Sequence, residues 1–324
     1  MHLEFLFNNP PIAEANAPAK IILCGEHAVV YGQPAIAVPV SALRVTVRAY
    51  ANSPGISGLR LVFGEPITQI TLADISESPP DNDPLALPLW LTLRHLAQKP
   101  PNVTLVLQSQ IPIASGLGSG AAVATALARA VVAALGQALE QAALNKIVYE
   151  VEKVHHGTPS GIDNTVIVYE QPVYFVRHQP IETFHIGAPL TFLIGDTGQS
   201  ASTRVAVGDV RRLFEAEPER IQPILDAIGD LVVLARKAIE RGDSEELGRL
   251  MVRNHGYLRQ LTVSSPELDT LVKAALDAGA LGAKLSGGGR GGNMIALVTP
   301  DTQNPVRAAL AAAGARRVFE TTLG

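Results

Sequence analysis

A glycine-dense turn carries the first chemistry that the sequence suggests. Gly116, Gly118 and Gly120 lie directly before the Ala/Val-rich stretch of residues 121–131. Glycine lets the backbone approach a ligand closely, and the first N–H groups of a helix have no partner within the helix. The turn therefore predicts an anion site, in which N–H donors and the helix dipole hold a phosphate. The alternative is that Gly and Ser only cap a core helix.

Two better-known phosphate motifs do not fit. The turns GLGSGA at 116–121 and GGGRGG at 287–292 both match the dinucleotide fingerprint formally. However, residues 111–115 separate the first turn from its strand, and the second is expected between two strands, whereas the fingerprint opens a helix directly after a strand. No Lys-Ser or Lys-Thr closes the first turn, so it is not a Walker P-loop. The charge of a bound phosphate must then be neutralised by residues elsewhere in the chain.

Two acids and a lysine are candidates for that neutralisation and for proton transfer. Glu152 lies near the end of an expected helix, and Asp163 follows it across the turn-forming stretch HHGTPSGID. Lys20 lies in the apolar strand AKIILC, where an ammonium group is costly unless it is paired. Asp163 is an attractive partner for Lys20. The alternative for each acid is a solvated helix flank.

A further pair of polar residues, Glu26 and His27, lies in the turn GEHAVVYG between apolar strands. A histidine in such a turn is either a hydrogen-bonded structural residue or a ligand contact. The turn alone favours the structural role, and the surrounding motifs remove that preference.

Composition predicts about two domains and argues against a nucleic-acid partner. A chain of 324 residues suffices for two ordinary cores, and Ala, Val and Leu supply them, because 47% of the residues are hydrophobic and only 5% aromatic. The net charge of −4, from 26 Lys+Arg and 30 Asp+Glu, gives no electrostatic reason to expect a nucleic acid or an anionic membrane as partner.

Cysteine usage and the apolar segments predict a soluble, cytoplasmic protein. Cys24 is the only cysteine, so the chain forms no internal disulfide. The N-terminal segment has no basic region before its apolar patch and is broken by Asn-Asn-Pro-Pro, unlike a signal peptide. The apolar run 121–135 contains Arg129 and is shorter than the roughly 20 residues of a spanning helix. We expect no membrane partner.

The first half of the chain is expected to alternate strands and helices. Closely spaced strands separated by Gly, Pro and Asn favour antiparallel pairing. The expected strands cover residues 19–24, 35–40, 45–50, 59–63, 69–72, 103–109, 165–169 and 173–176. Helices are expected around Trp90 and His95, after the glycine turn, and over 139–156.

The pattern loosens over 177–190, and we place the domain boundary there, with domains at 1–185 and 186–324. The second domain is expected to contain mainly helices. Ser265-Pro266-Glu267 offers a capping hydroxyl, a proline at the first helical position and an acid in the first turn. The expected strands are 191–196, 283–285, 293–298 and 317–322, and the expected helices are 205–216, 218–242, 244–261, 265–279 and 305–313.

Four motifs, in this order, resemble those of the GHMP kinase superfamily: PAKIILCGEHAVVYGQPAIAVPV, PIASGLGSGAAVATALARAV, HHGTPSGIDNTV and KLSGGGRGGNMIALV. The similarity extends through DTGQSASTRVAV and the SSPELDTL helix, so it covers most of the chain. The form GEHAVVYG is similar to the branch that phosphorylates mevalonate, whereas galactokinases diverge after Gly-Glu-His. The resemblance implies an α+β fold with an N-terminal ribosomal-S5-like domain and a C-terminal ferredoxin-like domain. A homodimer is compatible with it.

The implied activity is the transfer of a phosphoryl group from ATP to the primary hydroxyl of mevalonate, with Mg²⁺. Asp163 would act as base on that hydroxyl or orient it, and Lys20 would pair with Asp163. Glu152 would bind Mg²⁺, together with Ser119. The loop holding the ATP phosphates would comprise Pro112, Ser115, Gly116, Leu117, Gly118, Ser119, Gly120 and Ala121.

The resemblance also implies roles for the remaining motifs. Glu26, His27 and Thr197 would contact mevalonate. The loop 287–292, with Gly287, Gly288 and Gly289, would close the nucleotide side of the cleft.

The chain departs from the family pattern at two positions. Many relatives carry GLGSS, in which the second serine binds Mg²⁺, and this chain has Gly120 there. Either Ser119 substitutes, or water completes the metal shell and Glu152 is the only protein ligand. Arg290 stands where relatives often keep glycine, and its guanidinium either reaches a phosphate or is solvated.

Two rival functions follow from the same residues. The first is the same fold acting on another alcohol, such as a sugar or a phosphorylated mevalonate. The second is a nucleotide-binding protein without catalysis, for which loss of Lys20 or Asp163 would be the expected sign. Both residues are present.

Overall fold

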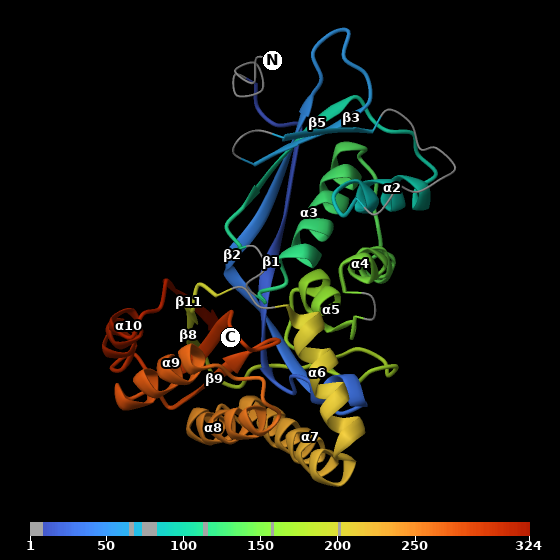
Figure 1. The fold of residues 1–324 in the computed structure, drawn as a ribbon. Helices are drawn as coiled ribbons and strands as arrows, with labels where there is room; N and C mark the ends of the chain where they lie inside the picture. Colours follow the sequence, from blue (N-terminus) through green and yellow to red (C-terminus); the bar gives the residue numbers. More distant parts are fainter. Residues whose placement is uncertain (1–8, 65–67, 73–82, 113–115, 157–158, 200–201) are drawn as a thin grey trace. The chain divides into compact units, whose positions relative to one another are not determined.

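A computed structural model describes residues 9–64, 68–72, 83–112, 116–156, 159–199 and 202–324 (Figure 1). The chain forms two compact units, each assembled from separate segments. Unit 1 comprises 1–19, 43–111 and 119–169, and unit 2 comprises 20–42, 112–118 and 170–324. The long strands β1 (Ala13–Cys24) and β2 (Ala35–Ala51) contribute residues to both units. The division into domains at residue 185 stays a prediction.

In unit 1 the strands follow the order β4–β3–β5–β2, and β1 pairs with β2. The strands β3 (Leu59–Phe63) and β5 (Val103–Ser109) run parallel, whereas β4 (Thr68–Leu72) is antiparallel to β3 and β2 is antiparallel to β5. From Leu43 to Ala49, β2 alternates buried and half-buried residues, as a strand with one core face does.

The two expected strands at 35–40 and 45–50 are one strand of 17 residues. Ser41 and Ala42, which separate them in the sequence, are exposed but remain extended. Serine is common in turns, but neither glycine nor asparagine accompanies it here, and the backbone continues as one strand through this locally polar point.

Three helices of unit 1 pack around α3 (Ser119–Ala134). These are α2 (Ala86–His95), α4 (Gln141–His156) and α5 (Ile162–Tyr169), and α3 itself lies on β5 (Figure 1). Its buried face consists largely of alanine, with Ala121, Ala124 and Ala128 fully inaccessible. Small side chains let three neighbouring helices approach one central helix closely.

The strand expected at 165–169 is wrong, because this segment belongs to helix α5. Ile162 and the run Asn164–Val168 are all buried, so neither a helical nor a strand period is visible in the sequence. The Thr165 hydroxyl donates to the Gly161 carbonyl 2.7 Å away, which is a helical side-chain bond. Packing against α3 and α4 overrides the strand preference of the β-branched residues.

Unit 2 contains an antiparallel sheet in the order β11–β8–β10–β9. Its strands are β8 (Leu190–Asp196), β9 (Gly282–Ser286), β10 (Asn293–Val298) and β11 (Arg317–Leu323). The short elements η1 (Ala28–Tyr31), β6 (Val173–Phe175) and β7 (Glu182–Thr183) complete its strand and turn segments, and β6 pairs with the start of β2.

The helices of unit 2 are α6 (Thr203–Ala216), α7 (Pro218–Arg241), α8 (Ser244–Gln260), α9 (Pro266–Asp277) and α10 (Gln303–Ala312). Helices α8 and α9 pack on β9, and aliphatic side chains fill the space between these helices and the sheet. The α+β class expected from the sequence is confirmed. The Ser265 hydroxyl accepts from the Leu268 N–H at 3.3 Å, so the expected start of α9 is confirmed as well.

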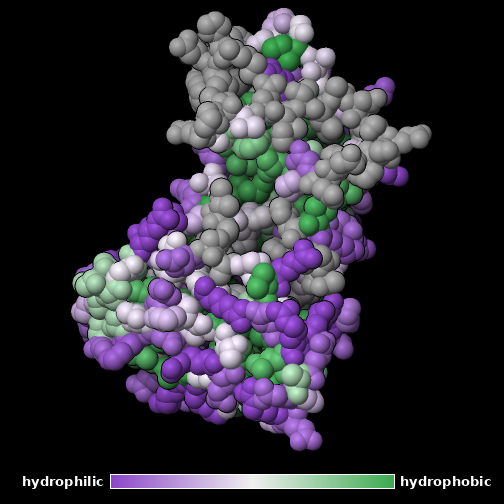
Figure 2. Space-filling model, in the orientation of Figure 1, coloured by the Kyte–Doolittle hydropathy of each residue, from purple (hydrophilic) through white to green (hydrophobic). Residues whose placement is uncertain are grey.

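The surface of unit 2 is mainly hydrophilic, as Figure 2 shows for one face. A pale green area lies where Figure 1 places α10, whose exposed residues include Ala308, Ala311 and Ala312. Within the part of the chain that the structure describes, no helix is long and apolar enough to cross a membrane.

Two glycines set the distance between α8 and β9. A Cβ on Gly248 would collide with the Leu281 carbonyl, and a Cβ on Gly282 would collide with the Gly248 backbone. The helix backbone therefore lies directly on the edge of the sheet, and this close approach places the next turns of α8 beside β9.

We predict that Gly248→Ala destabilises the protein by about 1 to 3 kcal/mol, because the added methyl group must push α8 away from β9. Gly256→Ala is the matched control in the same helix. A Cβ there meets nothing within 4 Å, so the change is expected to stabilise α8 by roughly 0.5 to 1 kcal/mol. Urea unfolding of both variants measures the difference, and equal effects would contradict the close approach.

Candidate active site

The expected phosphate turn has the backbone that the glycines predict. Gly116 and Gly118 adopt φ of 78° and 72°, in the left-handed region that favours glycine, and α3 begins at Ser119, directly after the turn. The Lys20 N–H donates to the Leu117 carbonyl at 3.0 Å, which ties the turn to β1. Ser115 lies outside the described residues.

Within unit 2 the turn lies beside the start of the second glycine loop, residues 287–292. A Cβ built on Gly287 would be 3.6 Å from the Gly116 carbonyl oxygen, and one on Gly116 would be 4.0 Å from the Ser286 carbonyl oxygen. The Ser286 hydroxyl in turn bonds both the N–H and the C=O of Ile22, at 3.2 and 3.0 Å. Three of the sequence motifs therefore meet in one unit.

At Gly289 the second glycine loop is held by a contact that leaves no space for a side chain. A Cβ on Gly289 would collide with the Val263 carbonyl, which accepts a 2.7 Å hydrogen bond from the Arg290 N–H. Thr197 donates from both its N–H and its hydroxyl to the Gly292 carbonyl, at 2.9 and 2.8 Å. Thr197 thus fastens one end of the loop in addition to any role in substrate contact.

His27 fastens the turn that precedes η1 to the same loop. Its Nε2 lies 3.0 Å from the Gly288 carbonyl, which only accepts, so Nε2 carries the proton. Nδ1 is buried and has no hydrogen-bond partner among the described residues. The pKa of His27 is lowered to about 4, mainly by burial; the hydrogen bond to Gly288 opposes this shift, and the positive charges of Arg290 and Lys284 contribute to it. The ring is therefore neutral at pH 7, with Nδ1 as an acceptor.

The backbone of His27 has φ 62° and ψ −48°, an unfavourable conformation for a residue with a side chain. Neighbouring Gly25, with φ 99°, has no space for a Cβ because the start of β2 fills it. The turn is consequently held from outside by its contacts and does not follow from local preference.

Glu26 lies in a buried cluster that the sequence analysis did not identify. Its carboxylate forms an ion pair with Lys284 and accepts from the Asn254 amide at 3.0 Å. The side chains of Glu26 and Lys284 are 1% and 0% exposed. Both carboxylate oxygens are therefore engaged inside the protein, on β9 and α8.

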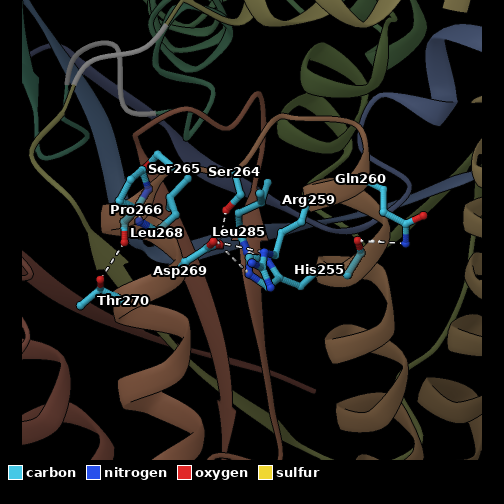
Figure 3. Close-up of polar contacts among 11 residues, drawn as sticks. His255, Arg259, Gln260, Ser264, Ser265, Pro266, Leu268, Asp269, Thr270 and Leu285 are labelled. Atoms are coloured by element: carbon cyan, nitrogen blue, oxygen red, sulfur yellow. Dashed lines mark hydrogen bonds and ion pairs between the residues drawn. The ribbon is translucent and has the colours of Figure 1, made fainter. Parts of the chain in front are cut away.

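His255 follows Asn254 on α8 and links three elements (Figure 3). Its Nδ1 accepts from the Leu285 N–H of β9 at 3.4 Å, so Nε2 carries the proton and donates to Asp269 of α9 at 3.1 Å. Ser264 also donates to Asp269, at 2.5 Å. Because the serine bonds the carboxylate and not the imidazole, this arrangement is no nucleophilic triad. It is a brace between α8, α9 and β9.

Arg290 extends from the second glycine loop to a helix. Its guanidinium forms an ion pair with Asp209 of α6 and bonds the Thr262 carbonyl at 3.3 Å. The hydrogen bond that the Arg290 guanidinium donates to the Asp209 carboxylate lowers the pKa of Asp209. The sequence offered a phosphate contact or a solvated side chain, and the structure shows a third arrangement, a link between the loop and α6.

Unit 1 holds the expected acids on adjacent helices. Glu152 of α4 is buried, and Asp163 lies half-buried in the first turn of α5. The Asn164 amide donates to Asn145 of α4 at 2.7 Å, which fixes α5 against α4 next to Asp163. The structure places Lys20 in unit 2, so its pairing with Asp163 stays a prediction.

The acids and the N-terminus of α3 agree with a magnesium site that has few protein ligands. Among the described residues, no group of three His, Cys, Asp or Glu could hold a metal. Magnesium usually takes only one or two carboxylates and fills its shell with phosphate and water. The buried carboxylate of Glu152 suits this chemistry because it is a hard oxygen ligand. Ser119, the first residue of α3, retains a hydroxyl, and Gly120 offers none.

Cys24 is a free and fully buried cysteine. The pKa of its thiol is raised to about 12, mainly by burial. The positive charge of Lys284 opposes this shift, and the negative charge of Glu26 adds to it. The thiol therefore stays protonated and behaves as a small core residue.

Comparison with known proteins identifies the family. Residues 86–171 match the GHMP kinases N terminal domain, and residues 235–316 match GHMP kinases C terminal. A mevalonate kinase of Pyrococcus abyssi is 40% identical over 320 residues and is covered, like this chain, to 94%. The chain belongs to the GHMP kinase family.

A second relative, found by sequence, and a solved structure extend this similarity over nearly the full length of the chain. A mevalonate kinase of Thermococcus sibiricus is 39% identical over 316 residues, or 93% of each chain. The crystal structure of L. major mevalonate kinase in complex with R-mevalonate matches with a TM-score of 0.83 at 29% identity, over 96% of this chain and 95% of that one. The expected GHMP kinase fold is thereby confirmed.

The structure adds Lys284, Asn254 and His255 to the residues of interest in this GHMP kinase. A signal for Lys284 was present, because a single lysine in the apolar strand GAKLS is expected to have a buried partner. Asn254 and His255 interrupt the buried face of α8. Their partners lie far along the chain. The sequence therefore indicates that these polar side chains are buried, but it does not indicate which residues they contact.

We predict that stability falls as the pH is lowered from about 6.5 to 4, because His27 and His255 are held neutral. Burial lowers the pKa of His255 to about 4, and Lys284 and Arg259 lower it against the opposing effect of Asp269. Between about pH 6.5 and 4 these histidines are protonated in the unfolded chain and neutral in the folded chain. Their contribution to the free energy of unfolding is therefore complete above pH 6.5 and is lost as the pH falls. Each shift corresponds to about 3 kcal/mol.

Urea unfolding at pH 7 and pH 4.5 measures this dependence. His255→Gln removes one of the two groups and should make the stability less dependent on pH, whereas His185→Gln, at an exposed position, should leave the dependence unchanged. An H255Q variant with the full wild-type dependence would refute the assignment.

Proposed function

We propose that this GHMP kinase transfers the γ-phosphoryl group of ATP to the primary hydroxyl of mevalonate, giving 5-phosphomevalonate and ADP. The observation that supports it most strongly is the 40% identity to a curated mevalonate kinase over 94% of both chains. The structure of a relative with bound R-mevalonate agrees in fold. We further propose that the enzyme works in the cytoplasm, where ATP is abundant and a free thiol such as Cys24 stays reduced.

The geometry of unit 2 supports ATP as the phosphoryl donor. Phosphoryl transfer needs little covalent chemistry from a protein and depends on positioning and charge stabilisation. The turn of Gly116 to Gly118 lies beside Gly287 and leads into α3, so backbone N–H groups of a helix start are available to phosphate oxygens. We assign the phosphates of ATP to Pro112, Ser115 and residues 116–121, and the nucleotide side to Gly287, Gly288 and Gly289.

We propose that Mg²⁺ binds Glu152 and that Ser119 supplies a second oxygen. The metal would neutralise phosphate charge, which no Walker lysine does in this chain. Glu152 contributes a buried carboxylate, and Ser119 contributes its hydroxyl at the helix start.

Asp163 is proposed to accept the proton of the mevalonate hydroxyl or to orient that hydroxyl for attack. Its half-buried position at the start of α5, braced by the Asn164–Asn145 bond, suits a group that must keep a fixed geometry. Lys20 is proposed to pair with Asp163 and keep it ionised. His27 would contact mevalonate through Nδ1, which is an acceptor for a hydroxyl group.

A coupled assay of ADP release over mevalonate, phosphomevalonate, galactose and homoserine tests the substrate. We expect turnover with mevalonate to exceed turnover with each other alcohol by at least roughly 100-fold in kcat/KM, because a site that bonds specific polar groups rejects substrates lacking them. Preference for a different alcohol would support the rival kinase. ATP binding without turnover of any alcohol would support the non-catalytic rival.

Asp163→Asn is expected to lower kcat by roughly 100- to 10,000-fold, because the amide cannot accept the proton, and to leave ATP affinity nearly unchanged. Steady-state kinetics and calorimetric titration with ATP separate the two effects. Asp301→Asn, at an exposed position, is the control and should match the wild type. Near-wild-type turnover by D163N would remove the role assigned to Asp163.

A further inference from the structure

The buried cluster of Glu26, Lys284 and Asn254 performs no step of the proposed reaction, although it lies next to the motifs that do. Lys284 is fully buried on β9, three residues before Gly287, the first residue of the second glycine loop. Its ammonium contacts the Glu26 carboxylate and the Leu285 carbonyl. A buried charge pair is often no more stabilising than apolar residues, so its presence calls for another reason.

Glu26 is the residue before His27, and the two side chains hold the same turn at different points. Glu26 connects it to β9 and α8, and His27 connects it to Gly288 in the glycine loop. The backbone of His27 is strained, so the turn keeps this conformation only while such contacts persist.

We propose that Lys284 is a positioning residue, which through Glu26 holds the turn of residues 25–32 at a fixed place against the second glycine loop. Lys284 acts without touching substrate. It lies on β9, the strand that leads into that loop, so one side chain sets the place of the proposed substrate turn and of the nucleotide loop together. The kinetic part of this inference rests on the proposed function.

The charges of the cluster support this role over direct substrate contact by Glu26. Both carboxylate oxygens of Glu26 are engaged, one by Lys284 and one by Asn254. Lys284 also neutralises the charge of Glu26, so this acid does not repel an anionic substrate at the neighbouring His27. The field of Lys284 reaches His27, since it contributes to the lowered pKa of that histidine.

Lys284→Met is the first test. It leaves Glu26 buried without its cation, so we expect the Tm to fall by on the order of 10 °C. Hydrogen exchange of the unliganded protein should rise roughly tenfold in peptides covering residues 24–34 and 284–294. If the variant folds, kcat/KM for mevalonate should fall about 100-fold. Lys273→Met, at an exposed position, is the matched control and should change none of these values.

The double variant Glu26→Gln/Lys284→Met separates positioning from stability. Both charges are removed, so the Tm should return to near the wild-type value. Because the connection between the turn and β9 stays broken, exchange in residues 24–34 should stay high and kcat/KM for mevalonate should stay at least roughly tenfold low. A double variant with restored Tm, wild-type exchange and wild-type kcat/KM would overturn the proposal, as would wild-type values for K284M itself.

Asn254→Ala tests the proposal if the other variants fold poorly. It removes one hydrogen bond to Glu26 and keeps the ion pair, so we expect a milder rise in exchange, roughly threefold, confined to residues 24–34. Unchanged exchange in this turn would count against the proposal. A wild-type protein that does not phosphorylate mevalonate would refute the proposed function, whereas the exchange measurements would still test the role of Lys284.

Discussion

The arrangement of unit 2 depends on one buried ion pair. Lys284 and Glu26 come from segments 258 residues apart, and their pairing joins the N-terminal turn to the edge of the C-terminal sheet. Removing either partner would leave a buried charge, which proteins rarely tolerate. Because this pair holds the turn and the strand β9 in place, two other contacts of the region can form: the hydrogen bond from Ser286 to Ile22 and the one from His27 to Gly288.

Close backbone approach is the second organising feature. The region contains several positions at which only a hydrogen fits: Gly25 against β2, Gly289 against Val263, and Gly248 against β9. In each case the absent side chain brings two backbones together and leaves carbonyl and N–H groups near one another. At these three positions, glycine is explained by the need for short distances between elements that come from different parts of the sequence.

Sequence patterns predicted local features well and distant partners poorly. The glycine turn before α3, the capped start of α9 and the kinase family follow from neighbouring residues, and the structure or the comparisons confirm them. Helix α5 was mistaken for a strand because nearly all of its short segment is buried, so its hydrophobic period carried no information. The link of Arg290 to Asp209 joins residues far apart in sequence, and no local pattern encodes such a partner.

The protonated, buried state of Cys24 has a practical consequence. Maleimide and methanethiosulfonate reagents need an accessible thiolate, so they should leave this thiol untouched in the native protein. Cysteines introduced on the surface of each unit would then be the sole sites of labelling, with no need to mutate the native one. Spin or fluorescent labels placed in this way would read the distance between the two units during turnover in the otherwise unmodified enzyme.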